Sequence, residues 1–477
     1  MLTYNDLIEL GENENERKDF IFRAIADHKA TEEYKIAHDA ELYMKTLNPT
    51  IMAYKKLLYT LSGEAVPDNF SANHKCASSF FKRFVTQENQ YLLGNGANFG
   101  DDGTKELLGS DFDVQLQKAG RAALVDGVSF AFVNHDHIEV FKYTEFKPLW
   151  DEEDGALKAG IRYWQVDADK PLRATLYELD GYTEYIKRKG EDMEILNDKK
   201  PYQQVISYSE VDGTQILDGY NYPTFPIVPL WGNPEHQSEL ITIRSQIDAY
   251  DLIKSGFAND LDDASMIYWT ISNAGGMDDV DLAQFIERMK VVKAAALGDG
   301  DAKAEAHTLD VPYQSREAYL TRLEADMYKD AMALDTTQIA AGQITATQIE
   351  AAYEPLNEKA DMFEYCVQEF VQGILRVLGI EDNVTFVRSK MANKAEEINA
   401  LLSASEYLSQ EYITEKLLTI LGDIDKVDEV MKQIADDSIS RMSSGEDEIE
   451  EEPEEETDNS DLEEINAMLD ELLKGLE

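Results

Sequence analysis

The chain has few cysteines and no long apolar run, and each shortage excludes a class of protein. Only Cys76 and Cys366 occur in 477 residues, which argues against a disulfide framework and favours a reducing compartment such as a cytoplasm. No apolar run approaches the roughly 18 residues of a membrane-spanning helix. The first residues lack a positively charged region, so we expect no secretory signal peptide.

Cations are also scarce. The chain holds 44 Lys and Arg against 94 Asp and Glu, a net charge of −50. Residues 446–477 alone contribute sixteen acids and one lysine. Tight, sequence-specific nucleic-acid binding relies on Lys and Arg and is therefore not expected. A negatively charged wall could still keep a passing polyanion centred and mobile, although simple solubility is an equally ordinary reason for such a charge.

No nucleotide-binding or nucleophile motif is present, which predicts a non-enzyme without a cofactor. The glycine patterns of P-loops, dinucleotide sites and serine hydrolases are missing. His135 and His137 have a metal-like spacing but no third ligand nearby, so an exposed turn is favoured. Asp299 and Asp301 flank a glycine and fit a turn without calcium.

One acidic cluster leaves a weak alternative open. Asp260, Asp262 and Asp263 could bind a divalent cation, and a carboxylate-metal hydrolase would use them. Three acids near a helix end more often face solvent or a neighbour. We therefore predict no metal site.

Residues 238–378 organise the chain as helix, insert, helix, short polar loop and long helix. The first helix is expected to start near Ser238, with Ile241, Leu252 and Ile253 adding a second apolar face to the main one. A helix that is apolar on two sides needs more than one neighbour. The second helix covers about 315–334.

The third helix comes after a loop without Lys or Arg. Thr345 and Gln348 would form its capping box. Apolar residues then recur at spacings of four and three from Ile349 to Val377. Pro355 lies inside the pattern and should bend the helix.

The flanking regions have simpler patterns. We expect helices over 12–18, 30–43, 52–61, 78–93 and 113–126, a loop over 98–104, and short strands from 127 to about 229. Pro223, Pro226 and Pro229 predict an extended approach to the first central helix and forbid a central strand. The insert should hold a strand (266–271), a helix (280–290) and a hairpin (291–309), and further helices are expected over 393–408, 413–421 and 427–439.

Three blocks of sequence resemble one known family. They are residues 80–94 with Gly127; residues 222–233 followed by 247–251, Ser255 and Asn259-Asp260; and residues 342–349 followed by Tyr353, Leu356 and Lys359-Ala360. In order and spacing the chain resembles the portal proteins of tailed bacteriophages, in the branch found in long-tailed phages of Gram-positive hosts. The matching blocks run from about 75 to 378.

The resemblance implies an α+β, mainly helical portal fold. Its parts would be a wing of helices and β-sheet (1–237), a stem helix (238–262), an α/β clip (263–312), a second stem helix (313–333), a tunnel loop (334–345), a long kinked wing helix (346–380), a helical crown (381–443) and a disordered acidic tail (444–477) that ends in a short amphipathic helix.

The resemblance, with the apolar patterns, also assigns candidate sites. The tunnel loop would present Asp335, Thr336, Gln338, Ala341, Gly342, Gln343 and Thr345. Stem packing would use Ile243, Ile247, Tyr250, Phe257, Leu320, Leu323 and Met327. The clip would dock partners through Asp278, Asp279, Phe285, Arg288, Lys290 and Lys293, and the tail through Leu462, Ile465, Leu469 and Leu472.

The function that the resemblance implies is a ring-shaped channel, expected to be a dodecamer, at one vertex of a phage capsid. Double-stranded DNA would pass through it non-specifically during packaging and ejection. Expected partners are further copies of the chain, the terminase large subunit, a head–tail adaptor, and the major capsid and scaffolding proteins, with no membrane partner. The protein would reside in the virion after assembly in the host cytoplasm. The alternative is a soluble acidic adaptor or scaffold without a channel.

Overall fold

The computed structural model describes most of the first 389 residues. It covers 2–265 except 12, 60–61, 69–70 and 209–214, then 268–272, 303–307, 313–337, 346–389 and 407–421, with some further positions, of which the last are 430–432. The chain divides into two compact units, 1–389 and 390–477. Among the described residues, no helix is both long and apolar enough to cross a membrane.

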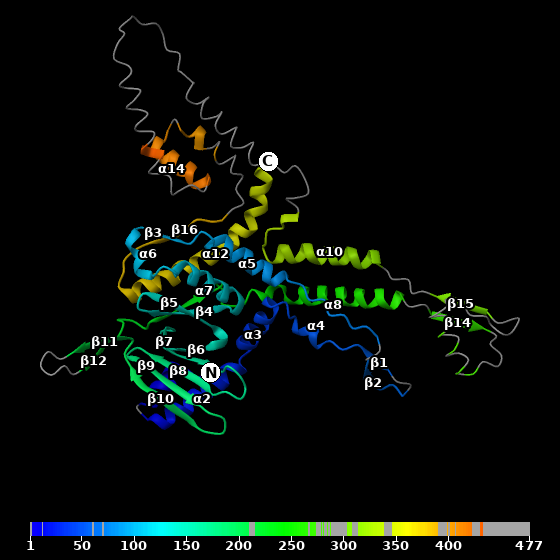
Figure 1. Ribbon diagram of the computed structural model, residues 1–477, viewed down its shortest axis with the longest axis horizontal. Helices are drawn as coiled ribbons and strands as arrows, with labels where there is room; N and C mark the ends of the chain where they lie inside the picture. The colour runs from blue at the N-terminus through cyan, green and yellow to red at the C-terminus, as the bar shows by residue number, and fades with distance from the viewer. Residues whose placement is uncertain are drawn as a thin grey trace, which may run out of the picture. The chain divides into compact units, whose positions relative to one another are not determined.

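The expected mixture of helices and sheets is confirmed (Figure 1). The elements before the central stretch are α1 (Tyr4–Glu9), α2 (Glu14–Ala30), α3 (Glu32–Met44), α4 (Pro49–Ala53), β1 (Leu57–Tyr59), β2 (Ala65–Pro67), α5 (Phe80–Leu93), β3 (Ala97–Phe99), α6 (Asp102–Leu108), α7 (Phe112–Asp126), β4 (Val128–Asn134), β5 (His137–Lys142), the 3₁₀ turn η1 (Tyr143–Glu145), β6 (Phe146–Trp150), β7 (Leu157–Trp164), β8 (Leu172–Glu178), β9 (Gly181–Lys187), β10 (Met193–Lys200), β11 (Gln203–Tyr208), β12 (Gln215–Tyr220) and β13 (Ile227–Trp231).

Among the described residues from the central stretch onward, longer helices dominate. The elements there are α8 (Leu240–Ser265), β14 (Tyr268–Ser272), β15 (Lys303–His307), α10 (Tyr313–Asp330), α12 (Ala346–Leu378), β16 (Val384–Phe386) and, in the second unit, α14 (Gln410–Leu421). Figure 1 shows α8 and α10 side by side, leading away from the body of the first unit.

Antiparallel sheets form the part of the body that the sequence predicted as β. One sheet has the order β10-β9-β8-β7-β6, and another has the order β13-β4-β5. Apolar residues of α2, among them Phe20, Ile21 and Ile25, are buried against the first sheet. A larger core joins α5, α7, α12 and the β13-β4-β5 sheet, and it also receives the first turns of α8. The body therefore holds one end of the central helices.

Two local expectations were wrong. Residues 54–59 are not helical: α4 ends at Ala53, and Leu57–Tyr59 form a strand whose Leu58 pairs with Val66. The last two residues of the helix expected over 52–61 lie outside the described residues. Residues 98–104 are not a loop either. Strand β3 pairs with β16, which lies far along the chain, and α6 begins after Asp101, whose Oδ1 accepts a hydrogen bond from the backbone N–H of Gly103. Local periodicity carries no information on a pairing of that sequence separation.

The proline-rich approach to α8 contains the strand β13. Pro229 lies inside β13 opposite Phe130. The strand is at the edge of its three-stranded sheet, where a residue without an N–H donor is tolerated. The expectation of an extended chain without a central strand therefore holds, and the extended chain is itself an edge strand.

The last part of the first unit is also a strand rather than the start of a helical domain. Residues 384–386 form β16 and belong with the body, and the second unit begins at Lys390. In that unit α14 matches the helix expected over 413–421. The acidic tail and its four apolar residues, Leu462, Ile465, Leu469 and Leu472, lie outside the described residues.

Candidate functional site

The first central helix is anchored on one side and bare on another. Leu240, Ile243 and Ile247 are at most 2% exposed and belong to the main core. Ile241 and Leu252 are each 43% exposed, and Ile253, the third residue of the expected second face, is half-buried. The second apolar face expected from the sequence therefore exists, and the chain leaves most of it in contact with solvent.

A ladder of three polar side chains fixes α8 against an extended segment. Residues spaced by four on the helix accept hydrogen bonds from every second backbone N–H of residues 74–78. A four-residue helical step of about 6 Å matches a two-residue extended step of about 6.6 Å, so the two spacings stay in register. The bonds run from His74 N to Asn259 Oδ1 (2.7 Å), from Cys76 N to Ser255 Oγ (3.0 Å) and from Ser78 N to Asp251 Oδ1 (2.9 Å).

The ladder gives a physical role to sequence letters that carried the family resemblance. Asp251, Ser255 and Asn259 are buried, at 0 to 7% exposure. Their oxygens satisfy backbone donors that would otherwise lose hydrogen bonds next to the helix. The stem helix and the segment that enters α5 are thereby held as one piece.

The second central helix packs along the first. Leu323 and Met327 of α10 are buried, while Leu320, Tyr250 and Phe257 are half-buried. Arg316 forms an ion pair with Asp260, and its guanidinium lies 5.9 Å from the ring centroid of Phe257. Near the other end of α10, the Gln246 amide donates to Asp330. These contacts hold the two helices alongside one another at both ends of α10.

The chain leaving α10 is clamped to α5 by one glutamine. The backbone N–H of Leu334 donates to Gln87 Oε1 at 3.0 Å, and the Gln87 amide donates back to the Leu334 carbonyl at 3.0 Å. The Leu334 side chain is buried beside Tyr91, Tyr353 and Leu356. The start of the expected tunnel loop is thus fixed by both backbone and side chain.

The helix after the loop returns to the same partner. Tyr353 of α12 stacks on Tyr91 of α5, with ring centroids 5.8 Å apart, and the Tyr91 hydroxyl donates to Asn357. Pro355 lies inside α12, and the helix changes direction along its length in Figure 1. Both ends of the connection between α10 and α12 are therefore held by α5.

A buried lysine joins four segments behind this connection. Lys359 Nζ lies 2.8 Å from Glu88 Oε2 of α5 and 2.7 Å from Glu239 Oε2 at the start of α8. It also donates to the carbonyl of Ala331, just after α10, at 3.2 Å. Burial alone would lower the pKa of Lys359, but the two carboxylates outweigh it and raise that pKa. Burial raises the pKa of Glu88 to about 7, against the opposing effect of Lys359.

Only the beginning of the expected tunnel loop is described. Asp335 Oδ1 accepts from the backbone N–H of Thr337 at 3.0 Å and from its hydroxyl at 2.6 Å, and Thr336 is exposed. The remaining loop candidates, Gln338, Ala341, Gly342, Gln343 and Thr345, lie outside the described residues. The expected capping box at Thr345 does so too.

Most of the expected clip (263–312) also lies outside the described residues. The described strands β14 and β15 pair with each other, with Thr270 opposite Glu305. Asp278 is exposed, and its Oδ1 accepts from the N–H of Val280 at 3.0 Å. The other docking candidates, Asp279, Phe285, Arg288, Lys290 and Lys293, and the strand expected over 291–297 are outside the described residues.

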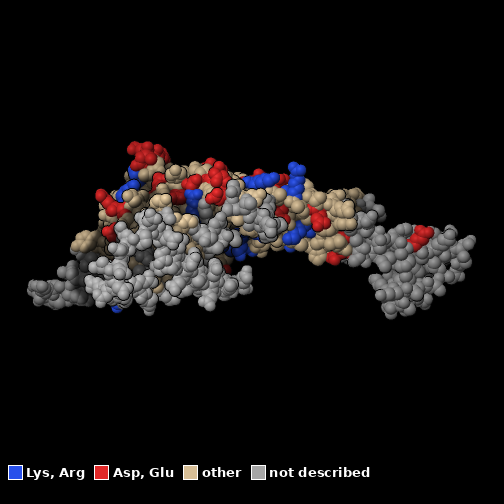
Figure 2. Space-filling view, turned by 90° about the horizontal axis from the view of Figure 1, so that it is seen from above, with Lys and Arg blue, Asp and Glu red and all other residues tan. Residues whose placement is uncertain are grey.

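The surface charge of the described part is mixed over the helix pair. Figure 2 shows red carboxylates gathered over the body and both blue and red side chains on the neighbouring, mostly tan surface. Of the acidic residues considered as metal candidates, Asp260 forms an ion pair with Arg316, and Asp262 lies within hydrogen-bond distance of a ring nitrogen of His74. In the part of the chain that the structure describes, no group of three or more His, Cys, Asp or Glu is arranged to hold a metal ion.

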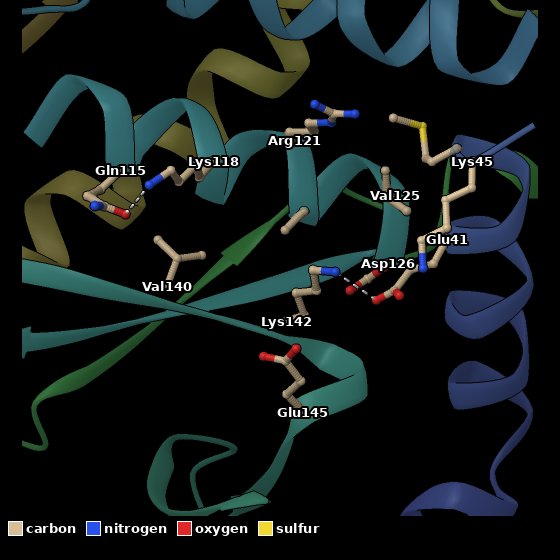
Figure 3. A pocket seen from close by; sticks show the side chains of 12 residues that line it. Glu41, Lys45, Gln115, Lys118, Arg121, Val125, Asp126, Val140, Lys142 and Glu145 are labelled. Atoms are coloured by element: carbon tan, nitrogen blue, oxygen red, sulfur yellow. Dashed lines mark hydrogen bonds and ion pairs between the residues drawn. The ribbon is translucent and has the colours of Figure 1, made fainter. Parts of the chain in front are cut away.

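A pocket of about 500 Å³ opens between α3, α7 and β5 (Figure 3). Lys118 and Arg121 line it from α7, and Lys142 of β5 pairs with Glu41 of α3 at 3.3 Å. Asp126 at the end of α7 is buried, and burial, then Glu41, raise its pKa well above the ordinary value. The lining has no nucleophile paired with a base.

Sequence reasoning missed Gln87, Glu88 and Glu239. One signal was present: Glu88 follows Phe84 by four residues and precedes Tyr91 by three, so a carboxylate interrupts the apolar face of α5. A buried acid needs a buried cation. The pairing with Lys359 could not be read from the sequence, because the two residues lie on helices far apart along the chain.

The chain is similar to portal proteins over most of its length. A family model described as phage portal protein, SPP1 Gp6-like, matches residues 25–443. The portal protein of Bacillus phage SPP1 is 24% identical over 392 residues, covering 73% of each chain. That of Clostridium phage phiCD119 is 23% identical over 359 residues, covering 69% of this chain and 77% of the relative. Among solved structures, a chain in the neck of an empty GTA particle is 12% identical, with a TM-score of 0.42 over 72% of this chain and 90% of the other.

Proposed function

This chain belongs to the SPP1 Gp6-like family of phage portal proteins, and we propose that it forms a ring of identical copies whose axis is the passage for double-stranded DNA at one capsid vertex. The role is structural rather than catalytic. The ring would be a dodecamer, built into the virion after assembly in the host cytoplasm.

One observation supports the ring most directly. Helix α8 is bound to the body through Leu240, Ile243 and Ile247, yet Ile241 and Leu252 on the same helix are exposed. Burying such side chains contributes about 1.5–3 kcal/mol each. A second copy of the helix pair is a partner of matching shape, and repeated heterologous contacts of this kind close into a ring. An acidic adaptor without a channel would leave this face without a role.

The connection between α10 and α12 would narrow the bore. Its start is clamped at Leu334 by Gln87, and residues 334–345 contain no Lys or Arg. A bore without cations forms no tight contacts with DNA phosphates. The packaging motor would therefore move the DNA through it with little resistance. Asp335, Gln338 and Gln343 would offer weak polar contacts, and Thr336, Ala341, Gly342 and Thr345 would complete the lining.

The insert and the tail would bind other proteins. Asp278, Asp279, Phe285, Arg288, Lys290 and Lys293 would dock the terminase large subunit during packaging and a head–tail adaptor afterwards. Leu462, Ile465, Leu469 and Leu472 would lie against a helix of a capsid or scaffolding protein. Co-purification that is unchanged after deletion of residues 444–477 would remove the role of the tail.

Electron microscopy of the purified full chain tests the ring. Wild type should give rings with a central hole, and Leu252→Asp should abolish them. The matched control is Leu179→Asp, which places the same charge at a 52% exposed leucine between β8 and β9. A packaging assay with assembled heads then tests the loop: Gln343→Lys should slow DNA uptake, and Gln343→Asn should not. Uniform monomers at high concentration would contradict the proposal.

A further inference from the structure

Cations gather around one pocket of this acidic protein, the cavity of about 500 Å³ between α3, α7 and β5 (Figure 3). Its lining includes Lys45, Lys118, Arg121 and Lys142, in a chain with 94 acids and only 44 Lys and Arg. Lys142 pairs with Glu41 at 3.3 Å. Lys45, Lys118 and Arg121 are exposed and form no ion pair with any described residue. We call these three residues the rim, and they can meet carboxylates of a binding partner.

The buried side of the pocket is acidic. Glu41, Asp126 and Glu145 line it, and we call these three residues the floor. Figure 3 shows the Asp126 carboxylate beside Glu41 and the end of the Lys142 side chain. In the described part of the chain, the only ion pair of the floor is that between Glu41 and Lys142. The floor therefore has more carboxylates than cations.

Asp126 is the floor residue that most needs a further partner. It is 7% exposed, and neither of its carboxylate oxygens forms a hydrogen bond of normal geometry with a described residue. Burial raises its pKa, Glu41 raises it further, and Lys142 and the backbone N–H of Tyr143 only partly oppose that rise. Asp126 also ends α7, and the C-terminal end of a helix favours a cation rather than an anion. A cationic group bound here would remove the cost of a buried carboxylate without a counter-charge.

The geometry of the vacant oxygens narrows the kind of cation. A guanidinium presents two parallel N–H donors that match the two oxygens of one carboxylate, and it is less strongly hydrated than an ammonium group. Met44, Val125 and Val140 supply an apolar wall of the same pocket, against which the methylene groups of an arginine can lie. A metal ion does not fit, because the described residues hold no group of three or more His, Cys, Asp or Glu arranged to bind one.

We propose that this pocket binds an arginine side chain of a protein partner, with the guanidinium paired to Asp126. The rim then favours a segment in which acidic residues stand beside that arginine, and it repels polyamines and polybasic segments. The lining contains no residue of α8 or α10. The inference therefore goes beyond the proposed ring and does not depend on it.

Peptide binding to the wild-type full chain, measured by isothermal titration calorimetry, tests the ligand. The probe is acetyl-Glu-Arg-Glu-amide. Its comparison peptides carry citrulline, a neutral group of the same shape, or lysine in place of arginine. We expect the arginine peptide to bind, and both comparison peptides to bind at least about tenfold more weakly, because charged, bidentate hydrogen bonds are lost. This comparison requires no variant of the protein.

Variants then test the position of the site. Asp126→Asn should weaken binding of the arginine peptide at least about tenfold, while Asp169→Asn, at an exposed aspartate, should not change it. Lys118→Ala with Arg121→Ala should weaken acetyl-Glu-Arg-Glu-amide but not acetyl-Gly-Arg-Gly-amide. Circular dichroism confirms that each variant folds.

Four results would overturn the inference. They are no binding of the arginine peptide at about 10 mM, equal binding of the citrulline or lysine peptide, unchanged binding by Asp126→Asn, and tighter binding of spermidine, which would make the ligand a free polyamine. Each of them would leave the proposed ring standing, because ring assembly is observed separately by electron microscopy.

Discussion

Lys359 of α12 and Glu88 of α5 form a buried ion pair, with 2.8 Å between Nζ and Oε2. The lysine is shared with Glu239 at the start of α8 and with the carbonyl of Ala331 after α10. Every segment that positions the α10–α12 connection therefore meets at one side chain. A buried cation of this kind sets the relative placement of helices more than it adds stability.

Replacing this lysine should be costly. Lys359→Met leaves two carboxylates buried without a cation, and we expect a loss of about 3–5 kcal/mol in the free energy of unfolding. Urea denaturation at pH 7 measures it. The control is Lys329→Met on the exposed surface of α10, for which a change within about 0.5 kcal/mol is expected. Equal effects of the two substitutions would contradict the role of Lys359 as a shared cation.

The pair should also make stability depend on pH. Burial raises the pKa of Glu88 from 4.5 to about 7, so the folded chain binds a proton that the unfolded chain releases. This contribution to stability is present below pH 4.5 and is lost as the pH rises through 7, with a slope of at most about 1.4 kcal/mol per pH unit. Glu88→Gln should remove that slope between pH 5 and 7.

Asp126 provides the comparison for the pH experiment, because burial raises its pKa as well. Unfolding curves are recorded for wild type, Glu88→Gln, Asp126→Asn and the double variant. The two single effects should add, since the groups lie in separate places: Glu88 beside Lys359, and Asp126 beside Glu41. A wild-type stability that rises between pH 5 and 7 to the same extent in all four proteins would contradict the assignment.

The polar ladder on α8 should hold the segment that enters α5. Ser255→Ala removes the acceptor of the Cys76 N–H, and we expect a loss of about 1–2 kcal/mol together with faster amide exchange at Cys76. Ser245→Ala, at an exposed position of the same helix, should change neither quantity. Unchanged exchange at Cys76 in Ser255→Ala would show that the ladder does not retain the segment.

The Gln87 clamp should control the start of the loop. Gln87→Glu keeps an acceptor for the Leu334 N–H but loses the donor to the Leu334 carbonyl. Hydrogen exchange of residues 334–337 should then increase severalfold, because about one hydrogen bond's net stabilisation of 0.5–1.5 kcal/mol is lost. Gln90→Glu, one turn further at an exposed position, is the control, and an equal increase there would argue against the clamp.

How much of the fold could be predicted from the sequence depended on how far apart along the chain the interacting residues lie. Helix α12 and the two faces of α8 follow from spacings of three and four, which are local. Strand β3 was missed because its partner β16 lies at residues 384–386, and β1 was missed because Leu57-Leu58-Tyr59 fits a helix as well as a strand. Among candidate site residues, Asp335 stays a prediction that the family resemblance supplied, whereas Gln87 and Glu88 acquire their roles only through partners on other helices.

The central claim is that the exposed face of α8 lies between identical copies closed around an axis. Native mass spectrometry of the purified full chain tests it most directly. We expect one dominant assembly whose mass is a fixed multiple of 53.9 kDa, and Leu252→Asp should reduce it to single chains while Leu179→Asp leaves it intact. A wild-type spectrum that contains only the 53.9 kDa chain at tens of micromolar would contradict the account.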